Sequence, residues 1–146
     1  MREMSPDELR QFLTTGTRTG KIAVVRKDGR PMVVPVWFDV DDDGSLVFTT
    51  WHTSIKAHAI RRRPQVSICV DEEFPPYAYV RVDGTAELVE DAELLRAWAV
   101  RLAGRYMGAE RAEEFGAKNA VPGELVVRVT PSRVIGRAEM AGKPST

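Results

Sequence analysis

The chain has little of what marks several common functional classes. Its 146 residues include one cysteine, Cys69, and two histidines, His52 and His58, and the formal net charge is zero. A single cysteine excludes an internal disulfide framework and a metal site built from several cysteines. The histidines lack the i, i+4 spacing of a helical metal pair, so no metal site is predicted. A neutral chain is also a poor candidate for a nucleic-acid partner bound through an overall basic surface.

Long apolar runs and catalytic signatures are absent as well. No segment approaches the ~18 apolar residues of a membrane span, and the start, "MREMSPDELRQFL", has no apolar signal core. We therefore expect a cytoplasmic protein without a membrane partner. There is no G-x-S-x-G motif and no glycine-rich phosphate loop of the Walker or Rossmann type, so no catalytic residues are predicted.

The sequence present is mainly β. Its length predicts one domain over residues 1–146. Strand patterns occupy two runs around Asp28-Gly29 between residues 21 and 40, and then residues 45–50, 66–71, 76–89 and 124–136. Helix patterns occupy residues 5–14, a segment from Thr53 or Ser54 to just before Pro64, residues 92–107 and about 109–118. Six strands with few helices between them predict a mainly β (α+β) fold, a small six-stranded antiparallel barrel.

Details within the strands predict their positions. Pro31 and Pro35 cannot donate to a ladder, so the second run is expected at an edge. In residues 66–71, alternation places Val66, Ile68 and Val70 in the core, and Cys69 is interpreted as a small buried hydrophobe. The long strand at 76–89 is expected to bend at Gly84, and the last strand to break at Pro131.

The segment "DVDDDG" matches the opening of a calcium-binding EF-hand loop at Asp39, Asp41, Asp43 and Gly44. The twelfth position, which requires a bidentate glutamate, is Thr50, and strand-forming sequence flanks the match. The segment is therefore interpreted as an acidic hairpin turn.

The segment "FTTWHTSIKAHAIRRRP" is the strongest candidate for a binding site. Lys56 falls in the first turn of a helix, where the dipole disfavours a cation by up to about one kcal/mol. Helix-start N–H groups, hydroxyls and an ammonium together suit a phosphate. Arg63 falls seven residues after Lys56, on the same face of the expected helix, and would extend the positive strip. In the alternative interpretation, Thr53 and Ser54 only cap the helix and Lys56 points to water.

Residues 20–71 resemble the pyridoxamine 5′-phosphate oxidase-like split-barrel superfamily, most closely its branch of coenzyme F420 (deazaflavin)-dependent and FMN-binding oxidoreductases. The most specific parts are "PVWF" after the Asp-Gly hairpin and the S-x-K-x-x-x-I-x-x-x-P-x-V-S-I run from Ser54 to Ile68. The similarity extends over roughly residues 5–137. It implies a six-stranded FMN-binding-type split barrel that forms a homodimer, with cofactors in grooves between the subunits.

The resemblance also implies site residues. The cofactor phosphate would be held by Thr49, Thr50, Ser54 and Lys56, with Arg63 nearby, and the backbone of Pro35, Val36 and Trp37 would run along the ring. Tyr77 and Tyr79 would approach from the partner subunit. The implied activity is hydride transfer from reduced F420 to a small hydrophobic or conjugated acceptor. The alternatives are an FMN-dependent oxidoreductase and a non-catalytic flavin, deazaflavin or haem binder. Relatives that oxidise pyridoxamine 5′-phosphate carry further arginines that bind the substrate phosphate, and a C-terminal extension. Neither is recognisable in this sequence, so vitamin B6 oxidation is not expected.

Overall fold

The computed structural model describes residues 1–142 of the protein. Within them the order of elements is β1 (Arg2–Glu3), α1 (Pro6–Thr14), β2 (Gly20–Val25), β3 (Pro31–Val36), β4 (Asp39–Val40), β5 (Leu46–Trp51), α2 (Ile55–Arg62), β6 (Gln65–Glu72), β7 (Ala78–Val89), α3 (Ala92–Met107), η1 (Ala109–Arg111), α4 (Ala112–Asn119) and β8 (Glu124–Ala138).

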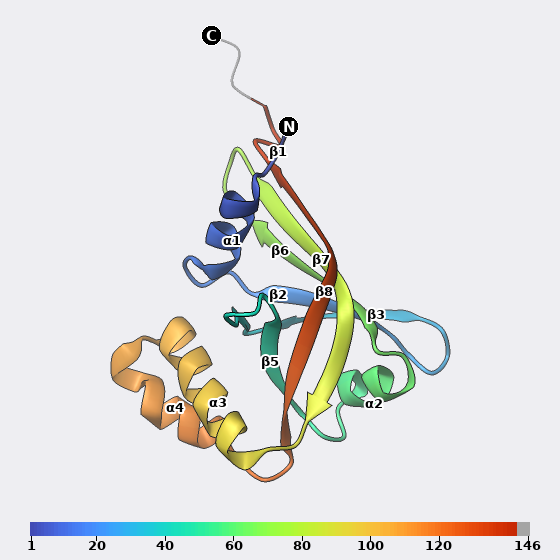
Figure 1. Ribbon diagram of the computed structural model, residues 1–146, viewed down its shortest axis with the longest axis vertical. Helices are drawn as coiled ribbons and strands as arrows, with labels where there is room; N and C mark the ends of the chain where they lie inside the picture. The colour runs from blue at the N-terminus through green and yellow to red at the C-terminus, as the bar shows by residue number, and fades with distance from the viewer. Residues whose placement is uncertain (143–146) are drawn as a thin grey trace.

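All strand pairs are antiparallel, in the order β3-β2-β6-β7-β8-β5-β4, and β1 pairs with the far end of β8. The sheet curls around its long strands β7 and β8, which cross the whole molecule (Figure 1). β2, β3, β5, β6, β7 and β8 correspond to the six predicted strands, and the two-residue strands β1 and β4 are additions. The predicted split barrel is confirmed. The edge position expected from Pro31 and Pro35 is also confirmed, because β3 ends the strand order.

β7 and β8 change register where the bend was predicted. Pairing runs from Val82–Val134 and Asp83–Arg133 directly to Gly84–Pro131, so one residue of β8 is skipped. A side chain at Gly84 would place its Cβ 2.5 Å from the carbonyl oxygen of Thr130. Glycine is therefore required for the close approach of the two strands. The predicted break at Pro131 is an irregularity within β8, not an end of the strand.

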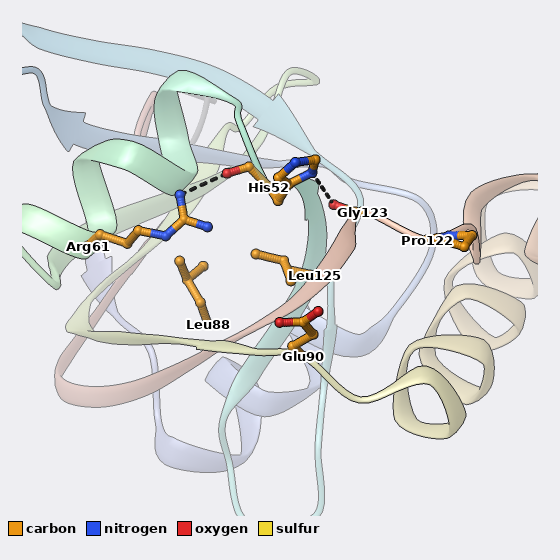
Figure 2. Close-up of a pocket in the computed structure, with 7 residues that line it drawn as sticks. All are labelled: His52, Arg61, Leu88, Glu90, Pro122, Gly123 and Leu125. Carbon is orange, nitrogen blue, oxygen red and sulfur yellow. Dashed lines mark hydrogen bonds between the residues drawn. The ribbon is translucent and has the colours of Figure 1, made fainter.

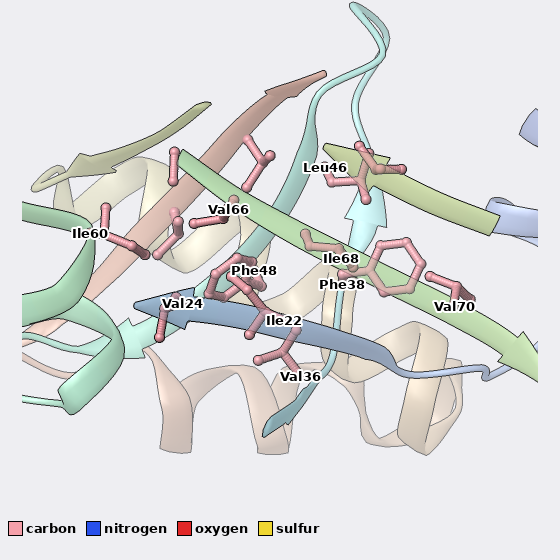
Figure 3. Close-up of a cluster of buried hydrophobic side chains, with 14 of the residues drawn as sticks. Ile22, Val24, Val36, Phe38, Leu46, Phe48, Ile60, Val66, Ile68 and Val70 are labelled. Atoms are coloured by element: carbon pink, nitrogen blue, oxygen red, sulfur yellow. The ribbon is translucent and has the colours of Figure 1, made fainter. Parts of the chain in front are cut away.

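The barrel interior is filled by aromatic and β-branched side chains from the curled sheet (Figure 3). Phe38 and Phe48 are completely buried among Ile22, Ile68 and the valines of the neighbouring strands. The predicted alternation in β6 is confirmed, because Val66, Ile68 and Val70 are all buried. The interpretation of Cys69 as a small buried hydrophobe is wrong, because it lies on the other face of β6 and is only half-buried. Burial raises the pKa of its thiol, and nearby Asp71 adds to that effect.

A second, smaller core lies between α3 and the outer face of β5 and β8. Val47 and Val126 pack there against Leu95 and Trp98. The last turn of α3 is tied to the rest of the chain by Arg105, whose guanidinium donates to the carbonyl oxygens of Leu13, Phe38 and Gly16. These contacts fix α3 beside the end of β3.

The acidic segment forms the predicted hairpin turn between β4 and β5. The amide of Asp41 donates to the carbonyl oxygen of Ser45, and the amide of Gly44 donates to that of Asp41. The carboxylate of Asp41 accepts a 2.7 Å hydrogen bond from Arg128, which holds its pKa below the ordinary value. Within residues 1–142 no three His, Cys, Asp or Glu side chains gather as a metal site would require. None of the helices described is long and apolar enough to cross a membrane.

Candidate functional site

A cavity of about 350 Å³ lies where β3 and β5 end and α2 begins, with α3 and α4 closing one side. Its walls come from segments far apart in the chain. It is lined by Pro35, Val36, Trp37, Thr49, Thr50, Trp51, Ser54, Lys56, Ala99, Leu102, Asn119 and Glu124.

One wall contains the residues around Lys56 for which a phosphate site was predicted. Ser54 is the N-cap of α2, and its hydroxyl oxygen accepts a 3.1 Å hydrogen bond from the amide of Ala57. The hydroxyl of buried Thr50 lies 2.8 Å from that of Ser54, which joins the end of β5 to the helix start. Lys56 follows in the first turn, which contains no acidic residue. This wall therefore combines the start of a helix, two hydroxyls and an ammonium.

The opposite wall is the chain leaving β3, and Tyr106 of α3 holds it in place. The rings of Trp37 and Tyr106 stack in parallel, with centroids 5.3 Å apart. The Tyr106 hydroxyl accepts from the amide of Phe38 at 3.2 Å and lies 2.9 Å from the carbonyl oxygen of Arg18, to which it can donate. Burial raises the pKa of this hydroxyl, so it stays protonated and able to donate at neutral pH. The segment is therefore a rigid surface against which a flat ring can lie.

Sequence reasoning missed several residues of this cavity, and Glu124 is the most important of them. It begins β8, pairs with Trp51 across the ladder, and is half-buried in the cavity wall. Burial raises the pKa of its carboxyl, and the positive charge of Lys56 opposes that shift. No local pattern marks Glu124, because its position depends on the β5–β8 register. The other missed residues are Trp51, Ala99, Leu102 and Asn119.

The structure brings together seven of the ten predicted site residues: Pro35, Val36, Trp37, Thr49, Thr50, Ser54 and Lys56. Arg63 is not among them. α2 ends at Arg62, and Arg63 has an extended backbone and an exposed side chain, so the helical spacing from Lys56 does not apply to it. Tyr77 and Tyr79 lie at the start of β7, outside the cavity of their own chain.

A larger cavity, of about 550 Å³, lies on the other side of the same β5–α2 loop (Figure 2). Arg61 donates to the carbonyl oxygen of His52 at 2.8 Å, and the His52 ring nitrogen Nδ1 lies 3.1 Å from the carbonyl oxygen of Gly123. These contacts hold the loop in place. The charged side chains of this cavity, Arg61 and Glu90, are exposed, and none of the predicted site residues lines it.

The curled antiparallel sheet defines a split β-barrel, with a cavity where its edge strand β3 ends. The chain belongs to the pyridoxamine 5′-phosphate oxidase family, whose sequence profile matches residues 5–138. A curated relative, the pyridoxine/pyridoxamine 5′-phosphate oxidase of Myxococcus xanthus, is 31% identical over 103 residues, which cover 70% of this chain and 50% of the relative. The chain thus spans about half the length of the curated relatives that it matches.

Solved structures show the same fold. A conserved hypothetical protein from Mycobacterium tuberculosis is 28% identical with a TM-score of 0.82, over 98% of this chain and 91% of that one. A protein described as an F420 reductase is 27% identical with a TM-score of 0.66, over 85% and 94% of the two chains. A FAD-binding protein from Mesorhizobium loti is 27% identical with a TM-score of 0.69, over 92% and 95%.

Proposed function

We propose that this protein is an oxidoreductase that binds coenzyme F420 in the cavity beside Lys56 and uses it to reduce a small hydrophobic or conjugated acceptor. The observation that carries the proposal is the meeting of Lys56, Ser54 and Thr50 with the Trp37 segment in one cavity. Similarity to an F420 reductase supports the choice of cofactor, and similarity to a FAD-binding protein keeps FMN as the alternative.

The residues present fit such a cofactor at both of its ends. Lys56 and the two hydroxyls would hold a phosphate, which is a strong hydrogen-bond acceptor, at the start of α2. The segment from Pro35 to Trp37, held by Tyr106, would orient the ring. A bound deazaflavin or flavin supplies the hydride chemistry itself, and the protein supplies binding and orientation.

The site would be completed by a second copy of the chain. Tyr77 and Tyr79 lie outside the cavity of their own chain, and the exposed fraction of Tyr77 is 44%. In the proposed homodimer these two tyrosines approach the cavity of the other subunit and cover the acceptor above the ring.

The test is a fluorescence titration of the purified protein with F420 and FMN in parallel, followed by a turnover assay. We expect tighter binding of F420, and oxidation of reduced F420 when a quinone such as menadione is added. Preference for FMN, with turnover, would assign the protein to flavin-dependent oxidoreductases. Binding without turnover over a panel of conjugated acceptors would favour a cofactor carrier, and binding of neither cofactor would overturn the proposal.

A further inference from the structure

The cofactor cavity contains a carboxylate as well as a lysine. Glu124 and Lys56 are the charged members of its lining, one at the start of β8 and the other in the first turn of α2. They are close enough for Lys56 to act on the titration of Glu124. Within the described part of the chain they form no ion pair. The two groups therefore line the same cavity without contacting each other as an ion pair.

The charge of this cavity is balanced, with one cation and one carboxylate in its lining. Arg63, which would have added a second cation, leaves the helix and is exposed, and Arg61 faces the other cavity. A phosphomonoester carries a charge of about −1.5 to −2 at pH 7, whereas a phosphodiester carries one negative charge. One lysine neutralises a diester, but it leaves the second charge of a monoester facing Glu124.

We propose that Glu124 makes the cavity selective for a ligand with a singly charged phosphodiester over one with a doubly charged phosphomonoester. The inference rests on the proposed function and narrows its ligand class. F420 carries its phosphate as a diester and FMN carries it as a monoester. The repulsion from the carboxylate scales with the charge of the ligand, and the half-buried position of Glu124 weakens its screening by water.

The test isolates ligand charge in a series that shares one ring. The series consists of the uncharged ring with its ribityl chain, the same compound as the methyl phosphate diester, and the same compound as the phosphomonoester. It is made with flavin or with 8-hydroxy-5-deazaflavin, whichever ring binds in the first titration. Dissociation constants are measured at pH 8, where the monoester is doubly charged because its second pKa is about 6.

Glu124→Gln removes the charge and keeps the size of the side chain. It should leave the dissociation constant of the uncharged compound unchanged, lower that of the diester about threefold and lower that of the monoester about tenfold. Doubling the ligand charge doubles the repulsion energy, so the factor for the monoester is roughly the square of the factor for the diester. The matched control is Glu90→Gln, which removes a carboxylate from the neighbouring cavity. It should change none of the three affinities.

The outcomes separate this inference from the proposed function. Equal effects of Glu124→Gln on all three compounds, or no effect on any, would overturn the selectivity and leave the cofactor site intact. A larger gain for the diester than for the monoester would also overturn it. If neither ring series binds, the proposed function fails and the selectivity fails with it.

Discussion

At the scale of single residues, the position of Lys56 in its helix is the observation behind the proposed ligand site. α2 has no acidic residue in its first turn and basic residues in its last, so Lys56 opposes the helix dipole. The structure shows that it faces a cavity with two hydroxyls and is not simply directed to water. This supports the interpretation of the segment as a phosphate cradle over simple capping.

Lys56→Ala should weaken cofactor binding by roughly ten- to a hundredfold, because hydrogen bonds to charged groups contribute about 1.5–3 kcal/mol. The stability of the cofactor-free protein should stay level or rise by a few tenths of a kcal/mol, since an unfavourable dipole interaction is removed. Fluorescence titration and thermal unfolding measure the two effects separately.

The control for a general loss of positive charge is Arg62→Ala. Arg62 is exposed in the last turn of α2 and faces away from the cofactor cavity. Arg61 is unsuitable as a control, because its guanidinium holds the carbonyl oxygen of His52 in the loop before α2. Equal losses of affinity in the Lys56 and Arg62 variants would argue against a phosphate contact at Lys56.

Glu124 should also make the stability of the cofactor-free protein depend on pH. Burial raises the pKa of its carboxyl above the ordinary value of 4.5, so the folded state holds this proton more tightly than the unfolded state. The free energy of unfolding therefore falls as the pH rises from the unfolded-state pKa of Glu124 to its folded-state pKa. Above the folded-state pKa the loss of stability is complete. Glu124→Gln should therefore raise the melting temperature at pH 7.5 by at most a few degrees, with no gain at pH 4. Calorimetry over this pH range measures the difference in melting temperature between the variant and the wild type. A difference that does not change with pH would contradict the raised pKa of Glu124.

At the scale of elements, the pairing of β8 with β5 and β7 places Glu124 in the wall of the cavity. β8 carries Glu124 at one end and pairs with β5 and β7, and the register change at Gly84 lets the long strands curl. Without that curl, β8 could not serve two parts of the barrel.

Gly84→Ala should destabilise the protein by about 1–3 kcal/mol, because the added Cβ would meet a backbone carbonyl that cannot move freely. The matched control is Gly104→Ala in α3, where a Cβ would make an ordinary 3.5 Å contact with Ala112. That change should stabilise the helix by roughly 0.5–1 kcal/mol. Urea unfolding of both variants gives the comparison, and similar effects of the same sign would refute the close-approach argument.

At the scale of the whole molecule, one end of the barrel presents apolar side chains to solvent. The exposed fractions of Phe74, Tyr77 and Met140 are 74%, 44% and 43%. Backbone hydrogen bonds from Tyr77 to Phe74 and from Met140 to Tyr77 keep the three together. Such a group of exposed apolar side chains favours a surface that another protein chain covers.

We predict a homodimer at micromolar concentration, with an interface of at least ~1,000 Å² that includes Phe74 and Tyr77. Phe74→Asp should shift the equilibrium toward monomers without unfolding them, because the side chain is exposed in the single chain. Val121→Asp, an exposed position in the loop before β8, serves as the control. Sedimentation velocity decides: a wild-type monomer that still binds cofactor tightly would rule out a site shared between subunits.

The sequence by itself determined the features that depend on near neighbours. Alternation predicted the buried face of β6, and the acidic turn followed from its flanking strands. Each of these patterns is local, because strand periodicity and helix capping act over a few residues. Of the seven predicted residues that line the cavity, Thr49, Thr50, Ser54 and Lys56 belong to such a local pattern. The other three came from the family resemblance.

Only the tertiary structure decided what faces Lys56. Glu124 lies 68 positions further along the chain, and it reaches the cavity through the register of β5 with β8 and the curl of the sheet. The packing of α3 against β5 and β8 likewise brings Ala99 and Leu102 to the cavity. Helical spacing placed Arg63 beside Lys56, but the helix ends one residue earlier. The charge balance of the site therefore depends on long-range contacts, to which no periodicity in the sequence corresponds.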